Sequence, residues 1–147
     1  MKFYSKSENV KRIKVFYNGV ARGDFTAACA VLDPDIEWKE PNVLALWFRG
    51  THYGVEAVRK EVLDPMVARL ASLEMRMKKF FEVGEHVIAI GHYHGRSKAT
   101  AKELDAACAH IWTLRNSRPV RFEAYHDDAK WLELAKEATR PEERLAA

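Results

Sequence analysis

The chain has 147 residues, of which 48% are hydrophobic and 31% are charged. This length suits one domain with a sizeable core, and the composition excludes a disordered chain. No apolar run approaches the ~20 residues that cross a bilayer, and the N-terminal stretch lacks the apolar centre of a signal peptide. We therefore expect a cytoplasmic protein without membrane contact.

The net charge is +3, and acidic residues are interleaved with the lysines and arginines throughout. A nucleic-acid surface needs cations clustered on one face, so we expect no nucleic-acid partner. Cys29 and Cys108 both lie in apolar stretches (AACAVL and AACAHIW). This setting favours buried free thiols over a disulfide or a metal pair.

Helical signals dominate the start of the chain. Ser5 and Glu8 form a capping box ahead of an apolar stripe with helical spacing, and Gly23 marks the end of that helix. Asp24 can cap a second, short helix through Leu32. A strand is expected after the next turn, within DPDIEWKE.

The middle of the chain combines an apolar loop with a further helix. Residues 41–53 show no clear period, so we expect a loop, and its aromatic part over residues 43–48 is either core or, as we favour, a hydrophobic lid at the mouth of a cavity. A helix begins at Gly54 and restarts at Asp64, which is expected to act as the N-cap of a helix with Pro65 at its first position.

The second half has the period of strands. We expect Asn116 and Ser117 to form a tight hairpin turn, and Asp127 or Asp128 to cap a last helix. Helices followed by a meander of strands indicate an α+β fold. The four predicted strands run from 72 to the turn at 83–86, and over 87–97, 104–114 and 119–126.

A two-residue hairpin loop also fixes which side chains share a face. With regular pairing, Cys108, His110 and Trp112 face away from the helices. The opposite, inward set consists of Ala107, Ala109, Ile111, Thr113, Val120, Phe122, Ala124 and His126.

Small residues on the expected inner face leave unfilled space. They are Ala89, Gly91, Ala107 and Ala109. Dense interiors do not tolerate large voids without a use, and a ligand pocket is one use. The alternative is that large aromatic side chains fill the space, the candidates being Trp38, Trp47 and Phe48.

The predicted first strand carries a carboxylate on its apolar face. Ile36, Trp38 and Glu40 fall at every second position, and Glu40 stands directly before Pro41. Removal from water makes a carboxylate a stronger base, which suits proton abstraction from carbon. The alternatives are that Glu40 pairs with a basic side chain or turns into solvent.

Three segments together resemble the SnoaL-like proteins, which are related to polyketide cyclases, ketosteroid isomerase and the nuclear transport factor-two fold. They are the helix–ARGDF–helix–DPDIEW segment, the RGTHYGVEAV segment and the AHIWTLRNS hairpin. The resemblance implies a cone-shaped, curved antiparallel sheet wrapped around three to four helices (a cystatin-like α+β barrel) that encloses a deep apolar cavity. It also implies a homodimer through the convex face of the sheet. We expect one domain over residues 1–138 and a polar tail over 139–147.

In ketosteroid isomerase, a carboxylate before a proline at the end of the first strand removes a proton next to a ketone. The resemblance places Glu40 at that position as general base. The isomerase's oxyanion tyrosine corresponds to Phe16, and its proton-donating aspartate corresponds to Ala109. Since these two donors supply much of the stabilisation of the enolate, steroid isomerisation itself is not expected.

A partner for Glu40 must therefore come from elsewhere in the chain. We select Tyr17 and His126 with Glu40 as catalytic candidates, and consider Tyr93 and His52 as further hydrogen-bond donors. An epoxide-type hydrolase is disfavoured because the sequence offers no second inward acid with an arginine. The predicted substrate pocket consists of Phe16, Trp38, Trp47, Phe48, Tyr93, Ala109, Ile111 and Phe122.

His92, His94 and His110 lie on neighbouring strands and form a possible zinc site, but structural or interface histidines are favoured and no metal or cofactor is expected. The preferred function is a cofactor-free isomerase or cyclase that performs acid–base chemistry on an apolar carbonyl metabolite. The alternatives are a non-catalytic protein that binds a hydrophobic small molecule, and a dimeric interaction module whose cavity is filled by its own side chains.

Overall fold

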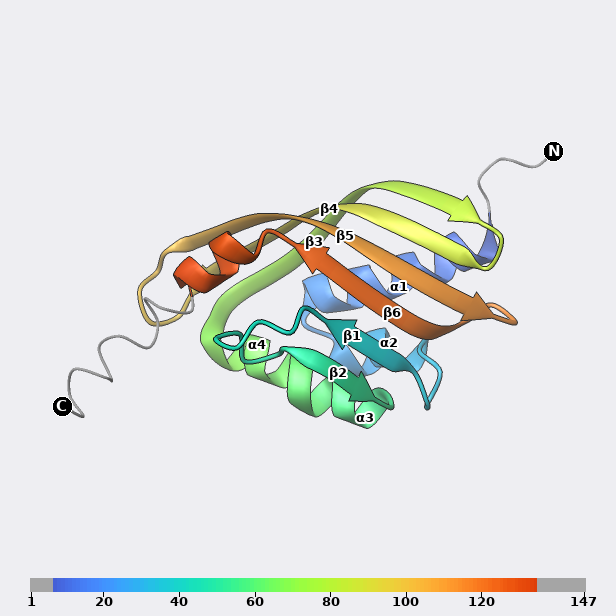
Figure 1. The fold of residues 1–147 in the computed structure, drawn as a ribbon, viewed down its shortest axis with the longest axis horizontal. Helices are drawn as coiled ribbons and strands as arrows, with labels where there is room; N and C mark the ends of the chain where they lie inside the picture. The colour runs from blue at the N-terminus through green and yellow to red at the C-terminus, as the bar shows by residue number, and fades with distance from the viewer. Residues whose placement is uncertain (1–6, 135–147) are drawn as a thin grey trace.

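The fold is a curved six-stranded sheet that wraps around helices on its concave side (Figure 1). A computed structural model describes residues 7–134. The strand order is β2-β1-β6-β5-β4-β3, and all neighbours are antiparallel except β1 and β6, which are parallel. The strands are β1 (Glu37–Glu40), β2 (Gly50–Tyr53), β3 (Leu70–Val83), β4 (His86–Ser97), β5 (Glu103–Arg115) and β6 (Arg118–His126).

Helices cover the inner side of this sheet, and a last helical segment follows β6 over residues 128–134. The predicted α+β class is confirmed. None of the helices in the described part of the chain is long and apolar enough to span a membrane. The helices before the sheet meander are α1 (Glu8–Arg22), α2 (Phe25–Ala30), α3 (Val55–Val58), the π-helical turn η1 (Arg59–Leu63) and α4 (Asp64–Arg69).

The ends of α1 and α2 follow the expected capping chemistry with one correction. Gly23 adopts the left-handed conformation that ends α1, and the Asp24 carboxylate accepts a hydrogen bond from the Ala27 amide at 3.0 Å. The N-cap of α1, however, is Ser7, whose hydroxyl accepts from the Val10 amide. The predicted cap Ser5 lies outside the described residues, and the predicted capping box is wrong because the helix begins at Glu8.

The third helical region runs through Pro65 without the expected restart. Between α3 and α4 the chain forms a wider π turn, in which the Asp64 amide donates to the carbonyl of Arg59. Proline has no N–H, and its ring crowds the carbonyl four residues earlier in a regular α-helix. The wider turn relieves this crowding, so Pro65 lies inside one continuous helical path.

The predicted loop over residues 41–53 contains a strand. Residues 50–53 form β2, which pairs antiparallel with β1 at the edge of the sheet. This edge strand is held by backbone hydrogen bonds and has no apolar alternation that would reveal it. The apolar residues of the remaining loop do not act together as a lid. Leu46 and Phe48 are buried in the core, while Leu44 is 81% exposed.

The hairpin between β5 and β6 has the predicted tight turn but a different register. Asn116 and Ser117 both have positive φ, as this turn type requires. Beyond the turn, Leu114 pairs with Pro119 and Thr113 pairs with Arg121, so the residue between them, Val120, has no partner. This β-bulge shifts the pairing by one residue, which reverses the faces of β5.

As a result, the even-numbered residues of β5 point inward. His110 and Trp112 are buried, and Trp112 pairs with Phe122 on the same face. The predictions that Ala109 and Ile111 line an inner pocket are therefore wrong, since both lie on the outer face. Regular pairing misplaced them because one extra residue in β6 turns every β5 side chain to the other side.

The interior is filled largely by aromatic rings. Trp38 stacks on Phe122 with ring centroids 3.7 Å apart, and Phe16 contacts both Trp38 and Trp112. The two cysteines are free thiols as expected, with Cys108 buried and Cys29 partly buried.

Three of the four small residues do not leave the unfilled space that the sequence suggested. Ala107 and Ala109 are on the outer face, and the space above Gly91 is occupied by the backbone of β3. At this point β3 has its own bulge between Met77 and Lys79, which brings its main chain close to β4.

Replacing Gly91 by alanine is expected to lower the free energy of unfolding by at least about 2 kcal/mol, because the new methyl group would collide with the Arg76 carbonyl oxygen and lie 2.6 Å from the Met77 Cα. The control is Gly84→Ala, where only the positive φ of +59° opposes the side chain and a loss of about 1 kcal/mol is expected. Urea unfolding of the two variants measures both losses. Equal losses would contradict the close approach of β3 and β4.

Candidate functional site

Glu40 is the last residue of β1 and lies inside the protein. It is 3% exposed, and its side chain shares the inner face with Trp38. The Trp38 indole N–H donates to Glu40 Oε2 at 2.8 Å. The other oxygen, Oε1, is buried and has no hydrogen-bond partner among residues 7–134. Since buried polar atoms normally have partners, this half-satisfied carboxylate is a candidate for chemistry.

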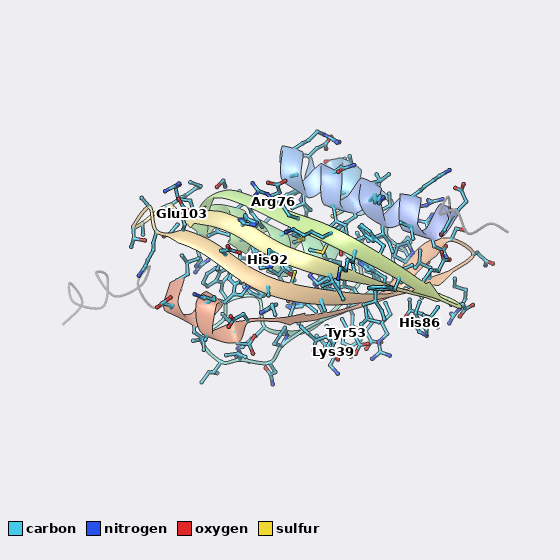
Figure 2. The ribbon with its side chains drawn as sticks, turned by 90° about the horizontal axis from the view of Figure 1, so that it is seen from above. Lys39, Tyr53, Arg76, His86, His92 and Glu103 are labelled. Atoms are coloured by element: carbon cyan, nitrogen blue, oxygen red, sulfur yellow. The ribbon has the colours of Figure 1, made fainter. Side chains whose placement is uncertain are left out.

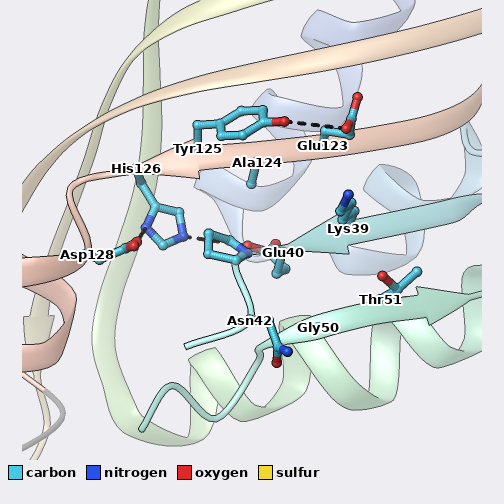
Figure 3. A pocket seen from close by; sticks show the side chains of 11 residues that line it. Lys39, Glu40, Asn42, Gly50, Thr51, Glu123, Ala124, Tyr125, His126 and Asp128 are labelled. Carbon is cyan, nitrogen blue, oxygen red and sulfur yellow. Dashed lines mark hydrogen bonds and ion pairs between the residues drawn. The ribbon is translucent and has the colours of Figure 1, made fainter. Parts of the chain in front are cut away.

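His126 ends the neighbouring strand β6 and faces the free oxygen of Glu40. Its Nε2 lies 3.6 Å from Glu40 Oε1, and its Nδ1 lies 3.0 Å from Asp128 Oδ1 (Figure 3). Neither contact is aligned as a hydrogen bond in the described part of the chain. An imidazole between two carboxylates can accept a proton on one nitrogen while the other is held by the second acid.

Aromatic rings surround this group of acids and imidazole. The His126 ring packs edge-on against Tyr93 and Phe48 at 5.7 and 5.9 Å between centroids, and it is 5.8 Å from Trp131. The side chains of Glu40 and His126 are only 1% and 0% exposed. Water is therefore largely excluded, which strengthens every electrostatic interaction at this place.

A second polar network lies deeper in the interior. The Trp112 indole N–H donates to the Tyr17 hydroxyl at 2.9 Å, and this hydroxyl lies 2.7 Å from Nδ1 of His110. On the other side of the ring, His110 Nε2 is 2.7 Å from the Tyr93 hydroxyl. Four side chains from three elements thus form one continuous buried chain.

Burial sets the protonation of this network. Desolvation, followed by the nearby His126, lowers the pKa of His110 to about 3. Desolvation also raises the pKa of Tyr17 and of Tyr93 well above the usual tyrosine value, and for Tyr93 the Glu40 carboxylate is the next cause. His110 is therefore a neutral imidazole, and both tyrosines keep their protons at neutral pH.

An open pocket of about 500 Å³ lies where β1 and β6 end. Glu40 and His126 form part of its wall, although their side chains are covered, so a ligand reaches them only when the surrounding side chains move. The remaining lining residues are Lys39, Pro41, Asn42, Gly50, Thr51, Glu123, Ala124, Tyr125 and Asp128.

The structure thus brings Glu40 and His126 together and places Tyr17 in the second network. Phe16 is core, and His52 is held between Glu61 and the Phe48 carbonyl at 2.7 and 3.0 Å. Of the predicted pocket residues, Tyr93 and Phe48 touch the His126 ring, while Trp47 contacts Phe48 and Trp131.

Sequence reasoning missed Asp128 and His110 as members of the two polar groups. The sequence predicts only a helix cap at Asp127 or Asp128, although the position of Asp128 two residues after His126 is a signal that could have found it. His110 was assigned to the outer face, and the three-histidine zinc site considered from the sequence is wrong because His110 points inward, away from His92 and His94.

Comparison with protein families gives one match: residues 13–122 fit the model of the SnoaL-like domain. No curated protein matches the chain.

Several solved structures share the fold. An NTF2-like protein from Burkholderia xenovorans is 30% identical, with 87% of this chain and 95% of that chain covered and a TM-score of 0.67. TerC, crystallised with polyporic acid, is 24% identical over 88% of this chain and 99% of its own, with a TM-score of 0.80. A protein with a ketosteroid isomerase-like fold from Catenulispora acidiphila, in complex with trimethylamine, is 14% identical over 85% of this chain and 92% of its own, with a TM-score of 0.74.

The neutral state of His110 predicts a pH dependence of stability. Its pKa is about 3 in the folded protein and ~6.5 in the unfolded chain, so the unfolded chain binds the extra proton as the pH falls below ~6.5. Stability is thus lost from pH 7 downward, by about 2 kcal/mol at pH 5 from this residue alone.

Urea unfolding at pH 7 and pH 5 measures the effect, with His110→Gln as the comparison. The variant is less stable at both pH values because Tyr17 and Tyr93 lose partners, but its loss between pH 7 and 5 is expected to be smaller than that of the parent protein. His86→Gln, at an exposed histidine, is the control. If the parent and His110→Gln lose equal amounts, His110 is not held neutral.

Proposed function

We propose that this chain, which belongs to the SnoaL-like domain family, is a small cofactor-free enzyme of the isomerase or cyclase type that acts by acid–base chemistry on an apolar carbonyl compound. The supporting observation is the buried Glu40 oxygen, which has no hydrogen-bond partner in the described part of the chain and lies 3.6 Å from His126 Nε2. A buried carboxylate with an unpaired oxygen lowers the stability of the fold, so its presence beside a pocket indicates a functional role, and proton transfer fits its surroundings.

In the proposed reaction, Glu40 removes a proton from the carbon next to the carbonyl group of the substrate. His126 relays that proton and returns it to a different atom of the product, and Asp128 orients the imidazole through Nδ1. Isomerisation and aldol ring closure both begin with this abstraction, so one acid–base pair serves either outcome.

The second network supplies the donor for the carbonyl oxygen. Trp112 can only donate, so the Tyr17 oxygen accepts from it and the Tyr17 proton is available to His110 Nδ1. His110 then carries its own proton on Nε2 and donates to Tyr93. The Tyr93 hydroxyl proton is then free to bond to a developing oxyanion. Tyr93 would thus take the role of the oxyanion tyrosine of ketosteroid isomerase, whose position is occupied here by Phe16.

A second candidate is a non-catalytic protein that binds a hydrophobic small molecule. The supporting observations are the pocket of about 500 Å³ beside Glu40 and His126 and the near-zero exposure of both side chains, which aromatic rings cover. A binding site formed by movement of these rings would need no proton transfer. In either case the proposed ligand is an apolar small molecule, and a cytoplasmic location stays a prediction.

The homodimer is proposed to form through the convex face of the sheet. Part of this face is apolar, and three large apolar side chains on it are exposed: Phe81 by 48%, Ile90 by 39% and Tyr125 by 53%. Cross-strand pairing joins Phe81 to Ile88 and Ile88 to Ile111, with Ala109 beside Ile90. Contiguous exposed patches of this kind mark interaction surfaces. We call these residues the outer apolar patch: Phe81, Ile88, Ile90, Ala109, Ile111 and Tyr125.

Glu40→Gln is expected to slow proton abstraction strongly while keeping the fold. The measurement is NMR detection of deuterium uptake at the α-carbon of a panel of apolar ketones, in parallel with thermal-shift binding of the same ketones and of polyporic acid. The parent protein should exchange at least one ketone, and the variant should be slower by about 10²-fold or more. The matched control is Glu37→Gln on the same strand, with a 40% exposed side chain and expected unchanged exchange.

Binding of a ketone to the parent protein and to Glu40→Gln, with no exchange by either, would support the binding protein instead. Equal exchange by both would remove Glu40 from the reaction. His126→Asn tests the relay separately, because it should slow exchange without weakening ligand binding.

Ile90→Glu is expected to convert a dimer into a monomer, since it places a charge in the outer apolar patch and leaves the interior untouched. Sedimentation velocity of both proteins over a concentration series measures this. Val15→Glu, at a 45% exposed apolar position on α1, is the control and should remain dimeric. A parent protein that sediments only as a monomer would reject the proposed interface.

A further inference from the structure

Two histidines and a carboxylate lie close together on the outer face of the sheet. They are near the C-terminal end of β4, beyond Ile88 and Ile90 of the outer apolar patch. His92 lies on the outer face of β4 (Figure 2), and His94 is two residues further along and points to the same side. Asp105 of β5 is the direct cross-strand partner of His94. One ligand atom from each of these three residues lies within 4.8 Å of the others. The site is separate from Glu40 and His126, which lie on the inner side.

The geometry points to a binding site for one divalent transition-metal ion of the zinc type, held by His92, His94 and Asp105. His92 Nδ1 is 2.8 Å from Asp105 Oδ1, and His94 Nε2 is 3.9 Å from the same oxygen. Zinc takes imidazole nitrogen and carboxylate oxygen at ~2.0–2.2 Å, so donors that share one ion stand about 3–4 Å apart. The 3.9 Å separation already fits this range, while the 2.8 Å contact must lengthen slightly and any separation beyond 4 Å, up to 4.8 Å, must shorten, which small side-chain rotations achieve.

The side chains are free to make these rotations. His92, His94 and Asp105 are 40%, 33% and 64% exposed. The backbone beneath them is fixed by continuous pairing of β4 with both β3 and β5, so the spacing of the donors is set by the sheet and not by a loop. A surface metal site needs ligand residues whose backbone positions are fixed and whose side-chain ends can adjust to the ion.

Charges of both signs flank the cluster, and Lys130 acts on Asp105. Glu74 is the cross-strand partner of His94 on the β3 side, so His94 stands between two carboxylates. Arg76 lies beside His92, but its guanidinium is paired with Glu74 at 2.8 Å. Two imidazoles and one carboxylate are the donor set of zinc and related ions, whereas magnesium and calcium prefer oxygen alone.

Calorimetric titration of the tag-free protein with zinc chloride tests the site. One zinc ion per chain is expected to bind, and magnesium chloride should give no saturable heat. His94→Ala and Asp105→Asn should each weaken zinc binding by at least about tenfold. These positions are exposed, and unchanged thermal unfolding of the metal-free variants will show that the fold is retained.

The matched control is His86→Ala, which removes an exposed histidine from the other end of β4 and should leave zinc binding unchanged. Cobalt(II) gives a second readout, because its visible absorption reports direct nitrogen and oxygen ligation and should be lost in His94→Ala. The proposal is overturned if the parent protein shows no saturable zinc binding, or if His94→Ala binds as tightly as the parent. An equal loss in His86→Ala would also overturn it, since that result indicates unspecific histidine binding.

Discussion

The parallel pairing of β1 with β6 determines the candidate site. It places the carboxyl ends of these two strands, which are far apart in the sequence, side by side. Trp38 lies opposite Phe122 across this pairing, and their stacked rings hold the register. Glu40 and His126 then follow at the carboxyl ends of the two strands. An antiparallel arrangement would separate these ends, and the carboxylate would have only the Trp38 indole as a partner.

The two polar groups depend on each other through Tyr93. Its ring packs on His126, while its hydroxyl bonds to His110. Because His126 also contributes to the low pKa of His110, a change in charge at one group is felt at the other. This coupling occurs where the aromatic core excludes water, so the fold confines its polar side chains to two connected groups inside an apolar interior.

Much of this fold was predictable from local signals. Gly23, Asp24 and the Asn116-Ser117 turn act as their residue types suggest, and the alternation of Trp38 and Glu40 correctly placed the carboxylate inside. Strand β2 and the β1–β6 pairing could not be predicted in this way, since they depend on backbone hydrogen bonds between segments whose side chains carry no matching pattern. The π turn is a local adjustment before Pro65, where the residue types suggested a restart of the helix instead. The candidate site was therefore only partly predictable. The sequence indicates Glu40 and His126, but it does not indicate that Asp128 and His110 belong to the two polar groups around them.

The single unpaired residue in the β5–β6 hairpin, Val120, has a consequence for how this architecture can diverge. It decides whether His110 and Trp112, or Ala109 and Ile111, belong to the interior. Loss or gain of one residue at this bend would exchange a polar, aromatic lining for a small, aliphatic one in one step, without any substitution in β5. Relatives that differ in length here can thus carry nearly the same strand and present it to opposite sides, so aligned letters in this hairpin need not be equivalent side chains.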